Sequence, residues 1–272
     1  MSNFLLLLYN MIFDKSNILK TPELKVNTES LVNGYKIPNI IHFTFCNKNL
    51  PIEVLRVIEH NKKICSGCKF VFYDDNDCEN LIKNNFNSEI YNAYTKINPT
   101  YGAMRADFFR YCVLYLYGGI YIDIKSKINY PIFTIIKPND ICVLDIPRTD
   151  KEPWRVNSPT YEQWLLIFAP NHPYLLSMIN LMCKYIGEKY IPTTINGIKL
   201  STKGKVLHIT GPDAFAKAIH TYIASNKKIL HRNVSYDTFS KLNGEINYKK
   251  MYKMNNKKHY SEASEASEPI YI

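Results

Sequence analysis

Three charged side chains, Asp107, Arg110 and Asp123, are the strongest candidates for chemistry in this sequence, because an almost wholly apolar stretch surrounds them. Asp107 and Arg110 are three residues apart, a spacing that places both on one face of a helix. Asp123 follows a second apolar run. Burying a charge without a partner costs several kcal/mol. We therefore expect these groups either to pair with one another or to surround a charged ligand at the end of a strand.

A helix, a glycine pair and a short strand must position these charges. The segment Ala103–Tyr117 contains no glycine or proline and is apolar or aromatic from Tyr111 onward, which predicts a buried helix of an α/β core. Gly118 and Gly119 then end the helix, because glycine readily takes the left-handed conformation. The segment Ile120–Ile124 alternates, which predicts a strand. The face opposite its isoleucines carries Tyr121, Asp123 and Lys125.

The motif A-x-D-x-x-R-Y, followed by G-G-I-Y-x-D, resembles the signature of glycosyltransferase family 32, which includes the initiating α-1,6-mannosyltransferases. The glucosylating clostridial toxins share the same core. The resemblance implies a GT-A-like, Rossmann-type α/β domain with a mostly parallel central sheet flanked by helices. It also implies three catalytic residues: Asp107 and Arg110 would hold the sugar of a nucleotide-diphosphate donor, and Asp123 would bind Mn²⁺ or Mg²⁺ on the diphosphate.

One position departs from the pattern of this family. The family's metal motif is Asp-x-Asp, but the second carboxylate is replaced by Lys125 in this chain. A lysine offers no lone pair to a divalent cation and repels it. We expect Lys125 either to pair with Asp123 or to reach the diphosphate itself, so the motif alone leaves a metal site short of a ligand.

The segment Ile37–Phe45 predicts the first strand of the domain, with a proline at its entrance. It resembles the opening strand of the family, whose C-terminal end meets the base and ribose of the donor, although Phe45 replaces the usual tryptophan. The resemblance makes His42, Phe43, Thr44 and Phe45 candidate nucleotide contacts. The alternative for His42 is an ordinary core histidine.

Two later turns add candidate donor contacts. The predicted strand Lys69–Tyr73 ends at an acidic cluster, where Asp77 is a good N-cap for the next helix. The resemblance places Asp74 near the donor, and the alternative is a simple turn and cap. The segment 206–210 predicts a strand before a tight turn at Gly211. It resembles a T-G-P that the family has beside its active site, which implies a backbone that passes close to the ligand at this glycine. The candidate cofactor-binding residues are His42, Phe43, Thr44, Phe45, Asp74, Tyr121, Lys125 and Gly211.

The predicted order of elements is strand, helix, strand, helix, long helix and strand. Such alternation is typical of a largely parallel sheet with crossover helices. Ligands of such sheets bind at the carboxyl ends of the strands. Residues 42–45, Asp74 and Asp123 all fall at or near predicted strand ends, which independently indicates one common site.

The C-terminal region supplies further candidate metal ligands. The segment 249–258 is basic and interleaved with tyrosine and methionine, and His259 and Glu262 follow it. In the family a C-terminal segment folds over the donor and adds a metal or phosphate contact. The resemblance therefore makes Asp123, His259 and Glu262 the candidate metal ligands; the alternative is a disordered basic tail. We expect an extension over 1–35, one glycosyltransferase domain over 36–262 and a mobile tail over 263–272.

Composition sets the remaining limits. The 272 residues suit one large α/β domain, and the net charge of +10 suits an anionic ligand, although a lysine-rich solvated surface explains it equally well. Seven scattered cysteines predict reduced thiols, hence the cytoplasm or the cytoplasmic face of a membrane. The one C-x-x-C pair, Cys65 and Cys68, lacks the second pair that a zinc site needs, so we interpret it as structural. The apolar segment Phe4–Phe13 is shorter than the ~20 residues of a membrane span, so we do not predict membrane association.

Together these features predict a divalent-metal-assisted hexosyltransferase, and the family resemblance implies that it retains the configuration of the sugar. Its donor would be a UDP- or GDP-linked sugar, and its acceptor a hydroxyl of a glycan or glycoprotein. One alternative is a non-catalytic nucleotide-sugar-binding homologue, which Lys125 favours. A second alternative, a nucleic-acid-binding protein, rests only on charge, because we find no zinc-finger, helix-turn-helix or basic-repeat pattern. We therefore expect no nucleic-acid partner.

Overall fold

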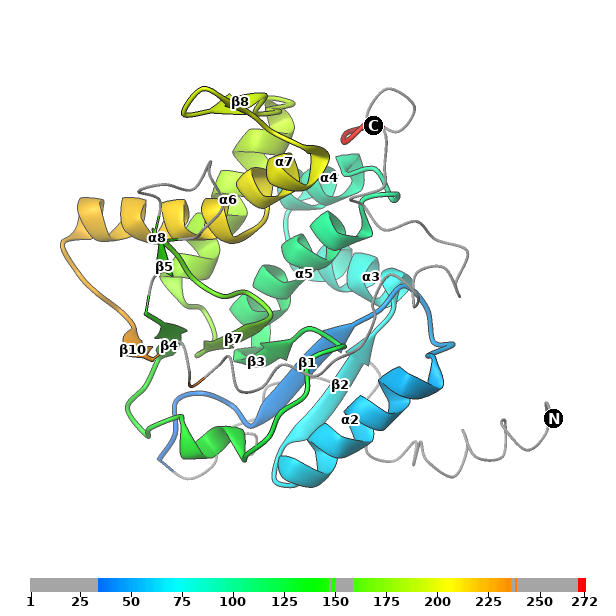
Figure 1. Ribbon diagram of the computed structural model, residues 1–272, viewed down its shortest axis with the longest axis vertical. Helices are drawn as coiled ribbons and strands as arrows, with labels where there is room; N and C mark the ends of the chain where they lie inside the picture. The colour runs from blue at the N-terminus through cyan, green and yellow to red at the C-terminus, as the bar shows by residue number, and fades with distance from the viewer. Residues whose placement is uncertain (1–33, 147, 150–158, 236–237, 239–268) are drawn as a thin grey trace.

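A computed structural model describes residues 34–146, 148–149, 159–235, 238 and 269–272 of the chain. These residues form an α/β domain in which helices pack on both faces of one central sheet (Figure 1). Among the described residues, no helix is long and apolar enough to cross a membrane. The predicted domain boundaries at residues 36 and 262 stay predictions.

The central sheet has six strands in the order β10-β4-β7-β3-β1-β2. β1 pairs in parallel with both β2 and β3, and β10 pairs in parallel with β4. β7 is antiparallel to β3 and β4, so one strand runs against five. The mostly parallel sheet of the predicted GT-A-like class is therefore confirmed. The strands are β1 (Ile40–Thr44), β2 (Lys69–Tyr73), β3 (Gly119–Ile122), β4 (Cys142–Asp145), β7 (Leu165–Phe168) and β10 (Arg232–Val234).

The helices form two layers of unequal thickness. Figure 1 shows α3 to α8 gathered on one face of the sheet and α2 on the other. The buried apolar residues fall into two matching clusters, one around α5 and α6 and one between the sheet and α2. The helices are α2 (Ile52–Ile64), α3 (Asp75–Asn85), α4 (Ser88–Lys96), α5 (Gly102–Tyr117), α6 (Pro173–Gly187), α7 (Thr202–Ile209) and α8 (Pro212–Asn226), with a short 3₁₀ turn, η3 (Ile132–Thr134). Two small hairpins join β5 (Arg148–Thr149) to β6 (Pro159–Thr160) and β8 (Thr194–Ile195) to β9 (Ile198–Lys199).

The turn from α5 into β3 confirms the predicted helix, glycine pair and strand. Gly118 and Gly119 have φ angles of 62° and 90°, a region that side chains with a Cβ rarely adopt. A Cβ on Gly118 would lie 2.6 Å from Pro170, and one on Gly119 would lie 2.5 Å from the carbonyl oxygen of Ile40. The chain therefore needs glycine at both positions to bring the end of α5 against the sheet. β3 ends at Ile122, so Asp123 directly follows its carboxyl end.

Two expectations about the second half of the chain are wrong. The segment 206–210 is not a strand, because α7 covers it up to Ile209. Val206 and Ile209, three residues apart, share the buried side of this helix, and the Ser201 side chain caps its first turn. The last residues are not all mobile either: Ile270 is fully buried and Tyr271 forms an isolated β-bridge with Ile97. Apolar side chains near the C-terminus thus anchor it on the helical layer.

Candidate active site

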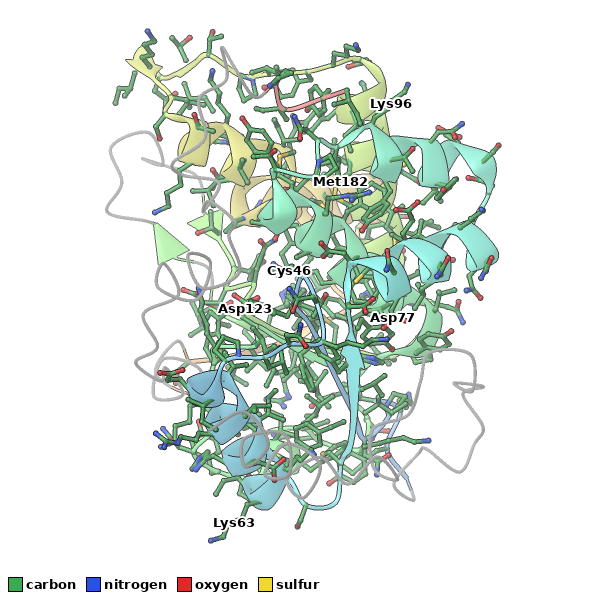
Figure 2. The ribbon with its side chains drawn as sticks, turned by 90° about the vertical axis from the view of Figure 1, so that its right-hand side faces the viewer. Cys46, Lys63, Asp77, Lys96, Asp123 and Met182 are labelled. Carbon is green, nitrogen blue, oxygen red and sulfur yellow. The ribbon has the colours of Figure 1, made fainter. Side chains whose placement is uncertain are left out.

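The structure brings the three charged candidates together at the carboxyl end of β3. The Arg110 guanidinium forms an ion pair with the Asp107 carboxylate on the same face of α5. The same nitrogen, Arg110 Nη2, also lies 3.7 Å from Asp123 Oδ1. Asp107 and Arg110 are buried, whereas the Asp123 side chain is 26% exposed. In Figure 2, Asp123 lies near the middle of the molecule, between α2 and the larger helical layer. The three charged groups therefore pair with one another, which is one of the two arrangements that the sequence predicts.

Burial and pairing act in opposite directions on these charges. Burial raises the pKa of Asp107 to about 6, although the charge of Arg110 and a hydrogen bond from Thr210 oppose this rise. Burial alone would lower the pKa of Arg110, but the charge of Asp107 outweighs it and the pKa is raised. The Arg110 guanidinium also lies 5.0 Å from the centre of the Tyr121 ring, a cation–π contact. The arginine therefore stays charged, and the carboxylate ionises only above mildly acidic pH.

Neutral groups from two distant segments complete the surroundings of the pair. Thr210 Oγ1 donates to Asp107 Oδ2 at 2.8 Å, and Arg110 Nη1 donates to the Gln163 carbonyl oxygen at 2.7 Å. The Tyr111 hydroxyl donates to the Thr210 carbonyl oxygen at 3.1 Å and accepts from Gln163 Nε2. Sequence reasoning missed all three roles. The only signal in the sequence was that these polar side chains lie among apolar residues. This signal does not show which groups they bond to.

Lys125 does not share a strand face with Asp123 as expected. β3 ends at Ile122, and the chain turns at once, with the Ser126 amide donating to the Asp123 carbonyl oxygen at 2.8 Å. The Asp123 amide donates to the Trp164 carbonyl oxygen at 2.8 Å, which fixes the start of the turn. Strand alternation stops there, so Lys125 belongs to a partly exposed turn rather than to the sheet.

The four candidates of the first strand divide between the core and the strand end. His42 is fully buried; its Nδ1 lies 3.0 Å from the Tyr73 hydroxyl and its Nε2 lies 3.0 Å from the Gly118 carbonyl oxygen. Burial lowers the pKa of His42 to about 4, partly offset by the Gly118 hydrogen bond. These contacts support the core-histidine alternative. Phe43 is buried, while Thr44 is half-buried at the end of β1. A nucleotide role for Phe43, Thr44 and the following Phe45 stays a prediction.

The acidic cluster after β2 is a helix cap. The Asp74 carboxylate accepts from the Asp77 amide at 2.8 Å, and the Asp77 carboxylate accepts from the Asp74 amide at 3.2 Å. Asp74 is therefore the N-cap of α3, and the expected cap at Asp77 is wrong by three residues because the helix begins earlier. Lys48 Nζ lies 3.3 Å from the Asp74 carboxylate. The turn-and-cap alternative thus accounts for the conformation of Asp74, and its donor role stays a prediction.

Gly211 is required by a neighbouring helix. It precedes the first turn of α8, and a Cβ there would lie 2.7 Å from Leu207 Cα in α7. The backbone at Gly211 thus passes close to α7, whereas the sequence predicted a close approach to a ligand. Two candidate metal ligands, His259 and Glu262, lie outside the described residues.

The described residues fit a substrate-bridged cation better than a self-contained metal centre. Among them, no group of three or more His, Cys, Asp or Glu side chains is placed to hold a metal ion. Asp123 contributes one partly exposed carboxylate. Mg²⁺ commonly binds through one or two carboxylates together with phosphates of the substrate and water. The donor set at Asp123 suits that mode.

Residues 51–142 match the family described as "Glycosyltransferase sugar-binding region containing DXD motif". An uncharacterized glycosyltransferase of Acanthamoeba polyphaga mimivirus is 39% identical over 89 residues, which cover 32% of this chain and 35% of that protein. The initiation-specific α-1,6-mannosyltransferase of Schizosaccharomyces pombe is 28% identical over 165 residues, which cover 55% of this chain and 40% of that protein. The chain thus spans less than half the length of these two curated relatives.

Among solved structures, the PaToxG glycosyltransferase matches 70% of this chain and 71% of its own, with 16% identity and a TM-score of 0.47. The matched region 51–142 contains both α5 and β3, together with Asp107, Arg110 and Asp123. The resemblance expected from the sequence is confirmed, because residues 51–142 match the sugar-binding region of the DXD glycosyltransferase family.

Proposed function

We propose that this chain is a glycosyltransferase that moves a sugar from a UDP- or GDP-linked donor to a hydroxyl of a glycan or glycoprotein. The observation that carries the proposal is the buried Asp107–Arg110 ion pair, which reaches Asp123 at the carboxyl end of β3 inside the matched sugar-binding region. Ligands of mostly parallel sheets bind at this edge. The initiation-specific mannosyltransferase of Schizosaccharomyces pombe and three other curated relatives are named as mannosyltransferases, which puts mannose first among the sugars to test.

The Asp107–Arg110 pair would hold the donor sugar. An ionised carboxylate accepts hydrogen bonds from sugar hydroxyls, and a guanidinium donates several in a fixed plane. Because both groups are buried and paired, their orientation is set before the donor arrives. Preorganised groups of this kind stabilise charge that develops in the transition state without a further cost of reorganisation. The pair therefore suits the oxocarbenium-like centre of sugar transfer.

Asp123, with His259 and Glu262 as further candidates, would hold a Mn²⁺ or Mg²⁺ ion. When bound, such a cation would neutralise the charge of the departing diphosphate. Asp123 is the part of this set that the structure describes, and its partial exposure leaves room for a phosphate-bound ion. Lys125, in the adjacent turn, would add positive charge on the same side. We further propose retention of configuration and a cytoplasmic location, both of which follow from the sequence reasoning above.

A non-catalytic homologue that binds nucleotide sugars is the second candidate. The specific observation in its favour is Lys125, which occupies the position of the second carboxylate of the metal motif. Such a protein would bind donor at the same pair without cleaving it.

The release of nucleoside diphosphate from a panel of UDP- and GDP-sugars, with Mn²⁺, Mg²⁺ or EDTA, tests the proposal. We expect turnover of one donor that EDTA abolishes. Turnover that is indifferent to EDTA would assign the diphosphate to basic side chains instead of a cation. Donor binding without turnover, in the presence of candidate acceptors, would establish the non-catalytic alternative.

A further inference from the structure

The Asp107–Arg110 ion pair is part of a closed ring of polar contacts, in which hydrogen bonds form the remaining links. Starting from the ion pair, Arg110 donates to the Gln163 carbonyl oxygen, and the Gln163 side chain donates to the Tyr111 hydroxyl. Tyr111 donates to the Thr210 carbonyl oxygen, and the Thr210 hydroxyl returns to Asp107 at 2.8 Å. All five residues are buried. Each of the five residues thus has two partners within the ring, while Arg110 Nε is buried without a hydrogen-bond partner among the described residues.

The ring joins three segments that lie far apart in the chain. Asp107, Arg110 and Tyr111 belong to α5, Gln163 precedes β7, and Thr210 forms the corner between α7 and α8. Figure 1 shows α7 and α8 on the same side of the sheet as α5. A connected buried polar network restrains its side chains, because another rotamer would leave further buried polar groups unpaired. The ring therefore restricts the orientation of the ion pair.

Thr210 is the member best placed to orient Asp107. Its side chain is fully buried, and its hydroxyl lies closer to Asp107 Oδ2, at 2.8 Å, than to the Val206 carbonyl oxygen, at 3.5 Å. The hydroxyl has a single proton, so the shorter contact is the stronger bond. The backbone at Thr210 is fixed in turn, because Gly211 packs directly against Leu207. The Thr210 hydroxyl is thus positioned both by its hydrogen bond to Asp107 and by the packing of the backbone that follows it.

We propose that Thr210 is a positioning residue, which fixes the Asp107 carboxylate in the orientation that holds the donor sugar. The inference rests on the proposed glycosyltransferase function and assigns to that site a residue outside the matched sugar-binding region, which ends at residue 142. Thr210 itself would not touch the donor. Tyr111 and Gln163 support it by fixing the Thr210 carbonyl and the Arg110 guanidinium.

The test compares Thr210→Val, which removes the hydroxyl and keeps the shape, with Thr210→Ser, which keeps the hydroxyl. We expect Thr210→Val to lower kcat by about 10- to 100-fold, because a small misplacement of a positioned group can cost up to about 100-fold. The affinity for the free nucleoside diphosphate should stay within about twofold, and Thr210→Ser should recover most of kcat. The matched control is Thr134→Val, whose hydroxyl bonds to the exposed Pro131 carbonyl oxygen in η3. A wild-type kcat in Thr210→Val, or equal damage in Thr210→Ser, would overturn the inference.

A double-mutant cycle separates failure of this inference from failure of the proposed function. Thr210→Val should lower the midpoint of thermal unfolding in the wild-type background and lower it much less in an Asp107→Ala background, which has no side-chain acceptor for the Thr210 hydroxyl, because the effects of substituting residues in contact are not additive. This cycle needs no turnover. If the wild type turned over no donor, the proposed function would fail while the cycle still measured the ring. Additive midpoint shifts would overturn the inference whatever the activity of the wild type.

Discussion

Two buried polar clusters contact α5, one at its C-terminal end at Gly118 and one along its length at Asp107 and Arg110, and they differ in the charge of their members. Around His42, the partners are the neutral Tyr73 hydroxyl and the Gly118 carbonyl oxygen. Around Asp107, the partners are the guanidinium of Arg110 and the hydroxyl of Thr210. The first cluster joins β1 to its neighbours in the core, whereas the second extends to the partly exposed Asp123.

The difference in charge favours a structural role for the His42 cluster and supports the proposed functional role of the Asp107 cluster. Burial lowers the pKa of His42 to about 4, so the imidazole is uncharged at neutral pH and serves as an ordinary hydrogen-bonding core group. Burial raises the pKa of Asp107 only to about 6, so its carboxylate is ionised at neutral pH beside a charged arginine. A buried ion pair adds little to stability compared with apolar packing. Under the proposed function, the Asp107–Arg110 pair would instead serve to recognise the donor sugar.

The largest expected effect is that of Asp123→Ala. This change removes the carboxylate that faces the diphosphate, and we expect turnover to fall by about 1000-fold in a protein that still folds. The measurement is nucleoside-diphosphate release at saturating donor, with circular dichroism as the check on folding. Turnover close to that of the wild type would remove Asp123 from the site.

Asp107→Asn should have the next largest effect. The substitution keeps the shape but loses the charge that faces Arg110 and the sugar, so we expect turnover to fall by about 100-fold. The affinity for the free nucleoside diphosphate, measured by calorimetry, should change little because that ligand lacks the sugar. An equal loss of affinity for the nucleotide sugar and for the free nucleoside diphosphate would count against a role specific to the sugar.

The pH dependence of turnover sharpens the comparison. Asp107 must be ionised to pair with Arg110, and its pKa is raised to about 6. The value of kcat/KM for the donor, which reports ionisations of the free enzyme, should therefore fall about tenfold per pH unit below about pH 6. Initial rates at donor concentrations well below KM, from pH 5 to pH 8, measure this limb, with Asp107→Asn as the control in which it should flatten. A rate that is constant from pH 5 to pH 8 in the wild type would contradict the assignment.

His42→Phe should change stability rather than chemistry. It leaves the Tyr73 hydroxyl and the Gly118 carbonyl oxygen without their partner, so we expect a loss of about 1–3 kcal/mol in the free energy of unfolding. The folded pKa of about 4 lies below the ordinary value of 6.5, so the unfolded chain binds the proton first as pH falls. The stabilisation by neutral His42 is thus present above pH 6.5 and is lost between pH 6.5 and 4.

Urea denaturation at pH 7.5 and pH 5 measures both effects of His42→Phe. The pH dependence of stability should be smaller in the variant than in the wild type. Donor affinity decides between the two interpretations of His42. A loss of donor affinity in a fully folded variant would favour the predicted nucleotide contact over the core histidine.

The sequence predicted the local features of this site well because each has a local cause. The helix expected at 103–117 is α5, which begins one residue earlier, and the two glycines end it as predicted. The two-part motif correctly indicated that Asp107, Arg110 and Asp123 lie close together. In each case the signal was a helical or strand period, or a residue with a special backbone conformation.

What the sequence could not predict depends on contacts between distant segments. Thr210 meets Asp107 across 103 residues, and Gln163 meets Arg110 across 53. The segment around Val206 has apolar positions that suit either a strand or one turn of a helix, and packing decided for α7. The antiparallel direction of β7 likewise follows from its pairing with β3 and β4 rather than from its own residues.

The most direct test of the account is a crystal structure of the protein with an intact nucleotide sugar. The account predicts that the sugar hydroxyls lie within hydrogen-bond distance of Asp107 and Arg110, with the diphosphate beside Asp123. A sugar bound elsewhere, with the Asp107–Arg110 pair closed and untouched as in the free protein, would contradict it.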